Sequence, residues 1–400
     1  MRVLFADKLP DRARVDLASS GFEVKAEAGT QGDALVARLA EWNPDVLVVR
    51  STVVEARHIA AARNLSLIVR AGAGVNTIDL TAASAAGIYV SNTPGKNAVA
   101  VAELTFALML GLDRHIAEGA AELRAGRWDK GRFSKARGLK GRALGILGMG
   151  DIGQAVAARA QAFGMEVHAW SRSLTPAAAQ KLHVIRHDRP EDVARQAHVL
   201  TLHLALTNET RGFVGESILS AMRPGAVLIN TSRSEVVDET ALRVALDGRG
   251  LRAGLDVFSN EPKGSTGDFD NPIARHPSVL GSHHIGASTD EAQEAVADEV
   301  VAIIRGYRST GRVANCVNLA RRTAATHVLV VRHRDRVGVL AGVLGVLREG
   351  SLNVEEMENT IFAGGEAAVA RIHTAGAPTG SVVERLGKLD DVLAVSVVAL

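Results

Sequence analysis

Short apolar runs alternate with helical patterns along most of this chain. In the first hundred residues the apolar runs VLFA, DVLVVR, LSLIVRAG and IYVSN predict strands. Between them, PDRARVDLASSG, GDALVARLAEW and TIDLTAASAAG carry apolar residues at helical spacing. Strands that alternate with helices predict a parallel sheet covered on both faces.

A second alternating series begins near residue 142. Its predicted strands are RALGILG, EVHAW, VLTLHLAL, AVLINTS, LRAGLDVF and SVLGSHH. One long helix is expected over 97–126, and its almost wholly apolar first part predicts burial between domains or subunits. An amphipathic helix over 288–311 follows the last strand.

The last part of the chain has a different order of elements. Residues 312–324 resemble a linker, and residues 325–400 predict the order β-α-β-β-α-β of a ferredoxin-like module. The predicted fold class is therefore α/β, with two Rossmann-like, doubly wound domains and a C-terminal ferredoxin-like domain.

Composition narrows the class of protein. The chain has 400 residues, which favours two or three domains, and 47% hydrophobic with 22% charged residues is typical of a soluble globular protein. A net charge of +2 excludes a strongly basic face for nucleic acid. The single Cys316, the lack of a signal peptide and the lack of a membrane-length apolar run predict a cytoplasmic protein. We expect no metal site.

The segment GMGDIG contains the spacing G-x-G-x-x-G, in Gly148, Gly150 and Gly153. It follows a predicted strand and opens a predicted helix. In that context the glycines permit a tight turn, and the helix N-terminus attracts a pyrophosphate. The segment therefore predicts a dinucleotide-binding turn.

Ser171, Arg172 and Ser173 follow the next strand, where such a unit usually places an acid that binds the ribose hydroxyls. A carboxylate there repels the 2′-phosphate of NADP, whereas serine and arginine donate hydrogen bonds to it. The segment slightly favours NADP. The alternative is that Arg172 stacks on the adenine or faces water, which leaves NAD as the cofactor.

Three polar residues follow the later predicted strands: Arg233, Glu261 and His284. The carboxyl ends of parallel strands share one edge, so these side chains can converge. A guanidinium holds a carboxylate, a histidine exchanges a proton, and an acid orients the imidazole. His283 is adjacent, but neighbouring strand residues face opposite ways, so we expect only His284 to reach the site.

Several ordered motifs resemble the D-isomer-specific 2-hydroxyacid dehydrogenase family over residues 1 to about 315. They are RAGAGVNTIDL, NTPGKNAVAVAELT, GILGMGDIG, NTSRSEVVDETAL, GLDVFSNEP and HHIGASTDEAQ. The resemblance implies that Arg233, Glu261 and His284 are catalytic. It also implies a substrate domain over 1–97 and 286–315, and an NAD(P)-binding domain over 98–285.

The same resemblance implies the ligand contacts. Cofactor contacts would be Gly148, Gly150, Asp151, Ile152, Gly153, Ser171, Arg172, Ser173, His203, Thr231, Ser232, Asp256 and Gly286. Substrate contacts would be Arg50, Ser51, Arg70, Ala73, Gly74, Val75 and Asn97. Where the family often has His-Thr-Pro, this chain has His203-Leu204-Ala205, so this loop lacks the hydroxyl that the family has near the phosphates.

Residues 325–400 resemble an ACT domain, a small fold that often binds amino-acid effectors. A phosphate-bearing substrate should meet extra cations, for which the candidates are Arg50, Arg70, Lys96, Lys130 and Arg132. Together with these cations, the ACT-like module favours 3-phosphoglycerate as the substrate and a role in serine biosynthesis. His333, Asp335 and Asn353 would hold L-serine as an effector; the alternative is a purely architectural domain. A glyoxylate or hydroxypyruvate reductase that uses NADPH is the rival within the family. A dinucleotide-sensing corepressor or scaffold is the rival of another class. The apolar helix and the terminal module predict a homo-oligomer, either a dimer or a tetramer.

Overall fold

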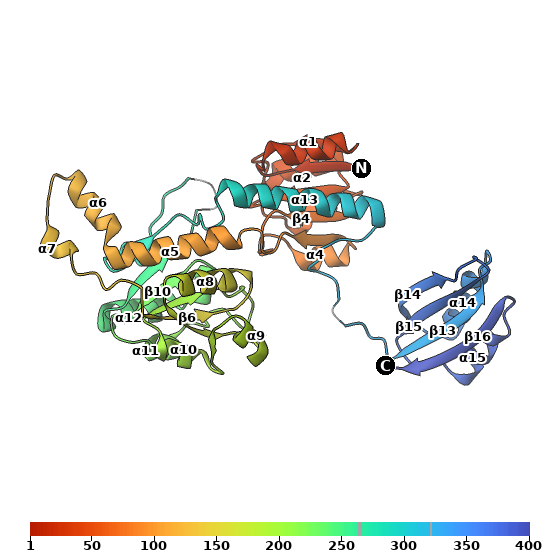
Figure 1. Ribbon diagram of the computed structural model, residues 1–400. Coiled ribbons are helices and arrows are strands. Elements are labelled where there is room, and N and C mark those ends of the chain that lie inside the picture. Colours follow the sequence, from red (N-terminus) through yellow and green to blue (C-terminus); the bar gives the residue numbers. More distant parts are fainter. Residues whose placement is uncertain (263–265, 321) are drawn as a thin grey trace. The chain divides into compact units, whose positions relative to one another are not determined.

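The computed structural model describes residues 1–262, 266–320 and 322–400. The chain divides into two compact units, Met1–Asn318 and Leu319–Leu400 (Figure 1). This boundary falls within the expected linker, of which Arg321 lies outside the described residues. Within the described ranges, no helix combines the length and the apolar character that crossing a membrane requires.

The first sheet is parallel, and its strands lie in the order β2-β1-β3-β4-β5. The strands are β1 (Arg2–Phe5), β2 (Glu23–Ala26), β3 (Val46–Val49), β4 (Leu67–Arg70) and β5 (Tyr89–Asn92). Its helices are α1 (Asp11–Ser19), α2 (Gly32–Trp42), α3 (Ala56–Ala61), α4 (Leu80–Ala85) and α13 (Asp290–Thr310), which returns to pack against α1. The apolar pattern missed β2 because this edge strand is polar and only partly buried.

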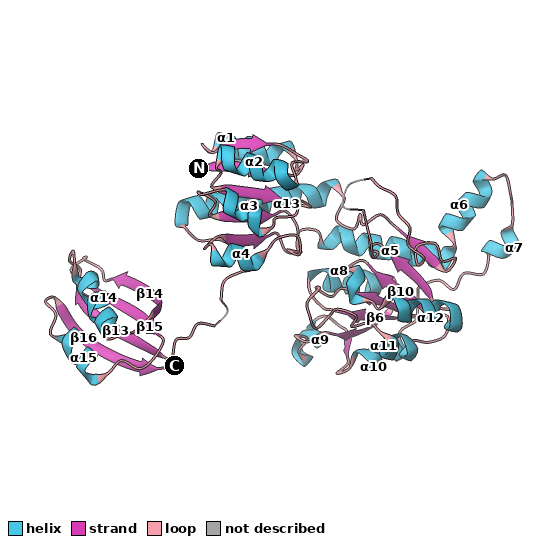
Figure 2. Ribbon diagram, turned by 180° about the vertical axis from the view of Figure 1, so that it is seen from behind, coloured by secondary structure: helices cyan, strands magenta, loops and turns pink. Residues whose placement is uncertain are grey.

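The second sheet is also parallel, in the order β12-β11-β10-β9-β6-β7-β8. Figure 2 labels two of its strands, β6 and β10. Its strands are β6 (Ala143–Leu147), β7 (Glu166–Trp170), β8 (Ile185–Arg186), β9 (Val199–Leu202), β10 (Val227–Asn230), β11 (Arg252–Leu255) and β12 (Val279–Gly281). Its helical elements are α5 (Ala98–Arg114), α6 (Ile116–Arg124), α7 (Lys130–Phe133), α8 (Asp151–Ala162), α9 (Pro176–Lys181), α10 (Pro190–Gln196), α11 (Glu216–Ala221), η1 (Ser234–Val236) and α12 (Glu239–Arg249). The predicted α/β class with covered parallel sheets is confirmed.

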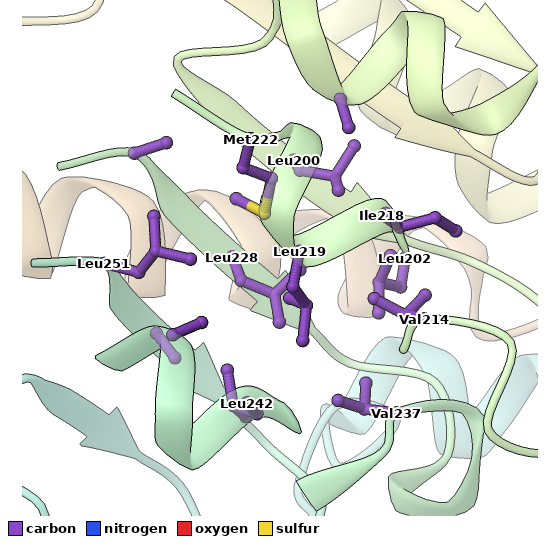
Figure 3. Close-up of a cluster of buried hydrophobic side chains, with 14 of the residues drawn as sticks. Leu200, Leu202, Val214, Ile218, Leu219, Met222, Leu228, Val237, Leu242 and Leu251 are labelled. Atoms are coloured by element: carbon purple, nitrogen blue, oxygen red, sulfur yellow. The ribbon is translucent and has the colours of Figure 1, made fainter. Parts of the chain in front are cut away.

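Apolar side chains fill both faces of this second sheet. On one face, Leu200, Leu202 and Leu228 pack beneath Leu219 of α11 and Leu242 of α12 (Figure 3). A separate cluster on α5 and α8 covers other strand residues. Burial of each such leucine contributes about 1.5–3 kcal/mol. The sheet is therefore rigid enough to fix the loops at its edges.

The single helix expected over 97–126 is wrong. The chain leaves helical geometry at His115, whose φ is 52°, and α6 begins after it. α5 packs on β10, β11 and β12, whereas α6 has no buried residue among those described. The apolar face ends where the sheet ends, so the amphipathic continuation over α6 has no sheet to cover.

The second unit has the expected β-α-β-β-α-β order. Its elements are β13 (His327–Arg334), α14 (Val339–Glu349), β14 (Val354–Ile361), β15 (Ala367–Thr374), α15 (Gly380–Gly387) and β16 (Val392–Ala399). The strands pair antiparallel in the order β14-β15-β13-β16. Leu329, Val331, Val343 and Leu386 belong to its core.

Asp7 joins the ends of β1 and β3 at the carboxyl edge of the first sheet. Its Oδ2 accepts from the backbone N–H groups of Arg50, Ser51 and Thr52 at 2.6, 3.1 and 3.0 Å. Burial by itself would raise the pKa of Asp7, but these hydrogen bonds hold it below its usual value of 3.8. The carboxylate therefore fixes the loop that carries Arg50.

We predict that Asp7→Asn lowers the free energy of unfolding by about 1–3 kcal/mol at pH 7, because the bonds lose their charged acceptor. Because the pKa of Asp7 is lower in the folded state, its carboxylate stabilises the fold at any pH above the usual pKa of 3.8. This stabilisation is lost as the pH falls through the lower pKa of the folded state. The difference between variant and wild type should therefore shrink in acid. Urea denaturation at a series of pH values measures it.

The matched control is Asp270→Asn, because the Asp270 side chain is 77% exposed. It should change the free energy of unfolding by less than about 0.5 kcal/mol. A difference for Asp7→Asn that is constant from neutral to acid pH would contradict the assignment.

Candidate active site

The glycine turn, residues 148–153, joins β6 to α8 where the strand order of the second sheet reverses. β6 lies between β7 and β9, so the crevice at their carboxyl ends is the usual ligand position in such sheets. Gly148 has a φ of 103°, and a Cβ built on it would lie 2.2 Å from the carbonyl oxygen of His203. Only glycine fits this contact between the two strand ends.

The turn has room for a pyrophosphate. A Cβ built on Gly150, the residue that precedes α8, meets no described atom within 4 Å. The backbone here is therefore open at a helix N-terminus, which suits the phosphates of a dinucleotide. The partly buried Ile152 packs against the core, while Asp151 lies beside Gly95 of the loop after β5.

Ser171, Arg172 and Ser173 follow β7 directly. Arg172 and Ser173 are exposed, and the hydroxyls of the two serines lie 3.5 Å apart. The pKa of Glu209 is lowered mainly by a hydrogen bond from Thr207, with a contribution from the charge of Arg172. Arg172 therefore already has an acid in its neighbourhood, in the loop after β9.

Polar groups after β9 and β10 are largely engaged within the protein. Burial lowers the pKa of His203 to about 3, and its Nε2 lies 3.0 Å from the Thr201 hydroxyl. Its Nδ1 has no hydrogen-bond partner in the described part of the chain. The Thr231 hydroxyl lies 3.1 Å from that of Thr105, and Ser232 donates to Asn230 at 2.8 Å.

Asp256 fixes the 282–286 loop, which carries His284. It is 1% exposed and accepts from the Ser282 hydroxyl at 2.6 Å and from the N–H groups of Ile285 and Gly286 at 2.9 and 2.8 Å. Three donors already occupy this carboxylate. Asp256 therefore anchors the loop that carries His284.

His284 and Glu261 form the pair that the sequence suggested. His284 Nδ1 lies 2.7 Å from Glu261 Oε2, and Glu261 Oε1 accepts from the Phe258 N–H at 2.8 Å. Burial would raise the pKa of Glu261, but the hydrogen bonds from His284 and Phe258 and the charge of Arg233 hold it below its usual value. Glu261 therefore stays ionised at neutral pH, and His284 Nε2 remains for a substrate.

The strand-alternation argument for choosing His284 over His283 is wrong. β12 ends at Gly281, and His284 adopts the left-handed conformation with a φ of 53°. His283 is exposed and has no described hydrogen bond or ion pair, whereas His284 faces Glu261. The turn of the loop, held by Asp256, selects the histidine.

Arg233 reaches across to the segment after β4. A Cβ built on Gly74 would lie 2.4 Å from Arg233 Nη2, so the guanidinium lies against this backbone. Arg233 Nη1 donates to Ser232 O at 2.7 Å, and Asn230 Nδ2 donates to Arg233 O at 2.9 Å. The structure therefore brings Arg233 together with Ala73, Gly74 and Val75, which are half-buried.

Arg70 lies near Arg233, and Arg50 lies near Arg70. Burial, and then the charges of Arg233 and Arg50, lower the pKa of Arg70 to about 10. Arg70 Nε has no partner among the described residues, and Arg50 Nη1 donates to Gln293 of α13 at 3.3 Å. Ser51 donates its hydroxyl to Asp7 at 3.1 Å. The site therefore has an excess of positive charge.

The remaining expected residues differ in their placement. Asn97 precedes α5, and its Oδ1 is buried without a partner in the described structure. Lys96 pairs with Glu299 of α13 at 3.0 Å. Lys130 and Arg132 lie on the exposed α7.

The expected effector residues do not converge within one chain. His333 is 1% exposed, with Nδ1 at 2.7 Å from Arg334 O and Nε2 at 3.0 Å from Asn359 Oδ1. Asp335 follows the end of β13, whereas Asn353 precedes β14 at the opposite end of the sheet. The three residues therefore do not form one site within a single copy, and the ring of His333 is enclosed by its own sheet.

Sequence reasoning missed the residues that hold these loops. Asp7, Asn92 and Asn230 each follow or end a strand, and Asn92 Nδ2 donates to Ala73 O at 2.5 Å. A polar residue at the carboxyl end of an apolar strand was the available signal.

Comparisons with known proteins agree with this geometry. Residues 106–286 match the model of the D-isomer specific 2-hydroxyacid dehydrogenase, NAD binding domain. The D-3-phosphoglycerate dehydrogenase of Methanocaldococcus jannaschii is 38% identical over 312 residues, which are 76% of this chain. The chain spans only 58% of the length of that relative.

Two further similarities cover more of the other protein. The hydroxypyruvate reductase of Thermotoga maritima is 40% identical over 259 residues, which are 64% of this chain and 82% of the relative. A solved structure of NAD⁺-bound 3-phosphoglycerate dehydrogenase from Entamoeba histolytica superposes with a TM-score of 0.66 at 26% identity, covering 80% of this chain and 99% of that one. The Thermotoga relative is 40% identical over 82% of its own length, and residues 106–286 match the family model. The chain therefore belongs to the D-isomer specific 2-hydroxyacid dehydrogenase family.

Proposed function

We propose that this chain is a D-3-phosphoglycerate dehydrogenase, which reversibly oxidises 3-phosphoglycerate to 3-phosphohydroxypyruvate in serine biosynthesis. The observation that carries the proposal is the position of Arg233, which lies against Gly74 and close enough to the His284–Glu261 pair to lower the pKa of Glu261. The name of the archaeal relative supports the same reaction.

Each of the three side chains has one task. The Arg233 guanidinium and the backbone of 73–75 hold the substrate carboxylate, since a guanidinium forms paired bonds to it. His284 Nε2 takes the hydroxyl proton in oxidation and returns it in reduction. Glu261 holds the ring through Nδ1, so that Nε2 faces the substrate.

The residues fit a nicotinamide dinucleotide. The open backbone at Gly150 and the N-terminus of α8 would hold the pyrophosphate. When bound, the cofactor accepts the hydride from C2 of the substrate in oxidation and donates it in reduction. Ser171 and Arg172 would contact the ribose, with a slight preference for NADP over NAD.

The phosphate group of the substrate would meet Arg50 and Arg70. Arg50 follows β3 and Arg70 ends β4 of the first sheet, and Arg70 lies close enough to both Arg50 and Arg233 for their charges to repel it. A phosphate relieves that repulsion, since its charge is opposite and its oxygens match guanidinium forks. The proposed substrate domain comprises residues 1–97 and 286–315, and the cofactor domain 98–285.

Residues 325–400 are proposed to be an ACT domain that binds L-serine. The β-α-β-β-α-β order of elements and the strand order β14-β15-β13-β16 of the second unit support an ACT domain. Because Asp335 and Asn353 lie at opposite ends of one sheet, a serine site would combine the two ends from two copies, which accords with a homo-oligomer.

A hydroxypyruvate or glyoxylate reductase is the second candidate. The Ser171-Arg172 pair, whose arginine is exposed, favours NADPH, and the Thermotoga relative is named a hydroxypyruvate reductase. Such a reductase acts on an acid that carries no phosphate, so it would not need Arg50 and Arg70 together.

We predict that His284→Ala lowers kcat by about 10²–10⁴-fold, because a general acid–base group typically contributes this much. Steady-state absorbance at 340 nm measures kcat, and fluorescence titration should show cofactor binding within a few-fold of wild type. His283→Ala is the matched control and should keep its kcat. Full turnover in His284→Ala would remove this histidine from the reaction.

A panel of 3-phosphoglycerate, 3-phosphohydroxypyruvate, hydroxypyruvate and glyoxylate, each with both cofactors, tests the substrate. We predict the highest kcat/KM for the phosphorylated acids, and a KM for them at least about tenfold higher in Arg50→Gln, because one charged hydrogen bond is worth about this factor. Hydroxypyruvate kinetics should barely change.

Arg57→Gln is the control, since Arg57 is exposed on helix α3, in the same proposed substrate domain. An equal effect of Arg50→Gln on phosphorylated and unphosphorylated acids would contradict the phosphate contact. A tenfold advantage of NAD over NADP in kcat/KM would reject the NADP preference.

We predict that L-serine binds to the full chain in titration calorimetry, and that Asn353→Ala weakens it by about tenfold, because a hydrogen bond to the charged amino acid is lost. Glu356→Gln on β14 is the control. The absence of binding up to millimolar serine would leave the second unit with an architectural role only.

A further inference from the structure

The second sheet has a hollow at its amino edge, the edge opposite the glycine turn and His284. The hollow has a volume of about 260 Å³, and an adjoining one of about 140 Å³ shares Arg137 and Arg142 with it. Arg142 precedes β6, and Arg252 begins β11, so both lie where strands begin. The length of a strand, about 15 Å, separates this amino-edge hollow from the candidate active site.

The lining of the amino-edge hollow is strongly cationic. Its charged side chains are Lys135, Arg137, Arg142, Arg223 and Arg252, with Asp113 as the one acid among the described lining residues. Asp113 is itself engaged, since it accepts from Arg142 Nη1 at 3.0 Å and from the Gly138 N–H at 2.9 Å. The cations therefore outnumber the acid by four.

Arg142 is the buried member of the lining. It is 9% exposed, and its Nε has no partner among the residues that the structure describes. Burial and the charges of Arg137 and Arg252 lower the pKa of Arg142, although the charge of Asp113 raises it. A buried guanidinium with an unused donor, among other cations, lacks an acceptor.

His198 shows the same shortage of acceptors. Its Nδ1 accepts from the Ala143 N–H at 3.0 Å, and its Nε2 lies 3.2 Å from Arg223 Nη1. A neutral imidazole accepts at only one nitrogen, so its Nε2 carries the proton and faces another donor. Burial, followed by the charges of Arg223, Arg142 and Arg137, also lowers the pKa of His198. His198 Nε2–H and Arg223 Nη1–H therefore face each other without an acceptor, and an anion beside them would accept from both.

We propose that the amino-edge hollow is a second ligand site, which binds a small multivalent phosphate-bearing anion. Guanidinium groups form paired, charge-assisted bonds to phosphate oxygens, and several cations here lack acid partners. At roughly 30 Å³ per water molecule, the larger hollow holds a polyatomic anion, and the adjoining one receives a second phosphate group. The site does not depend on the substrate of the enzyme.

Titration calorimetry of the full chain with inorganic pyrophosphate tests the proposal, at constant ionic strength and with saturating NADPH to fill the phosphate positions of the cofactor site. The wild type should bind pyrophosphate saturably, and pyrophosphate should raise its melting temperature. The double variant Arg137→Gln/Arg223→Gln should bind at least about tenfold more weakly, because each removes a charged donor. Both residues are exposed, and Arg137→Gln alone repeats the test if the double variant fails to fold.

Two controls locate the binding. Arg243→Gln, on the exposed face of α12, and Arg50→Gln, at the candidate active site, should both retain pyrophosphate binding. Unchanged affinity in the double variant, or no saturable binding by the wild type, would overturn the proposal. A third outcome would also overturn it: the wild type does not bind pyrophosphate, and the double variant loses the oligomeric state of the wild type. In that case an acid of a second copy neutralises the amino-edge hollow.

Discussion

The parallel pairing of the strands in both sheets is the constraint on which the site depends. Parallel strands start at one edge and end at the other, so residues far apart in the chain meet if they follow strands. Gly148, Arg233 and His284 follow β6, β10 and β12, and Arg70 ends β4 of the other sheet. The buried, apolar strands determine where these residues lie, and the loops determine only the direction in which each side chain points.

Buried carboxylates complete what the strands begin. Asp7 collects three backbone N–H groups of the loop after β3, and Asp256 collects two from the loop after β12. Each gives otherwise unpaired donors a charged acceptor, which is among the stronger single interactions available to a loop. Neither residue need touch a ligand to determine where Arg50 and His284 lie.

The two edges of the second sheet differ in how their charges are balanced. At the carboxyl edge, Glu261 pairs with His284 and lies close to Arg233. At the amino edge, Asp113 alone faces five cations among the described residues. An excess of buried or half-buried positive charge costs stability unless an anion offsets it. The same sheet thus accounts for both a reaction site and a proposed anion site.

The apolar pattern was sufficient for the α/β class, for the strands on which the site lies and for the glycine turn, because buried parallel strands are continuous apolar runs. The family motifs singled out Arg233, Glu261 and His284. Polar elements such as β2 gave no apolar signal, and the helix break at His115 follows from where the sheet ends. Only the tertiary structure showed that the loop held by Asp256 turns His284 toward Glu261, enclosed His333 and gathered Arg137, Arg142 and Arg223. These outcomes depend on which loops and strand starts meet in space.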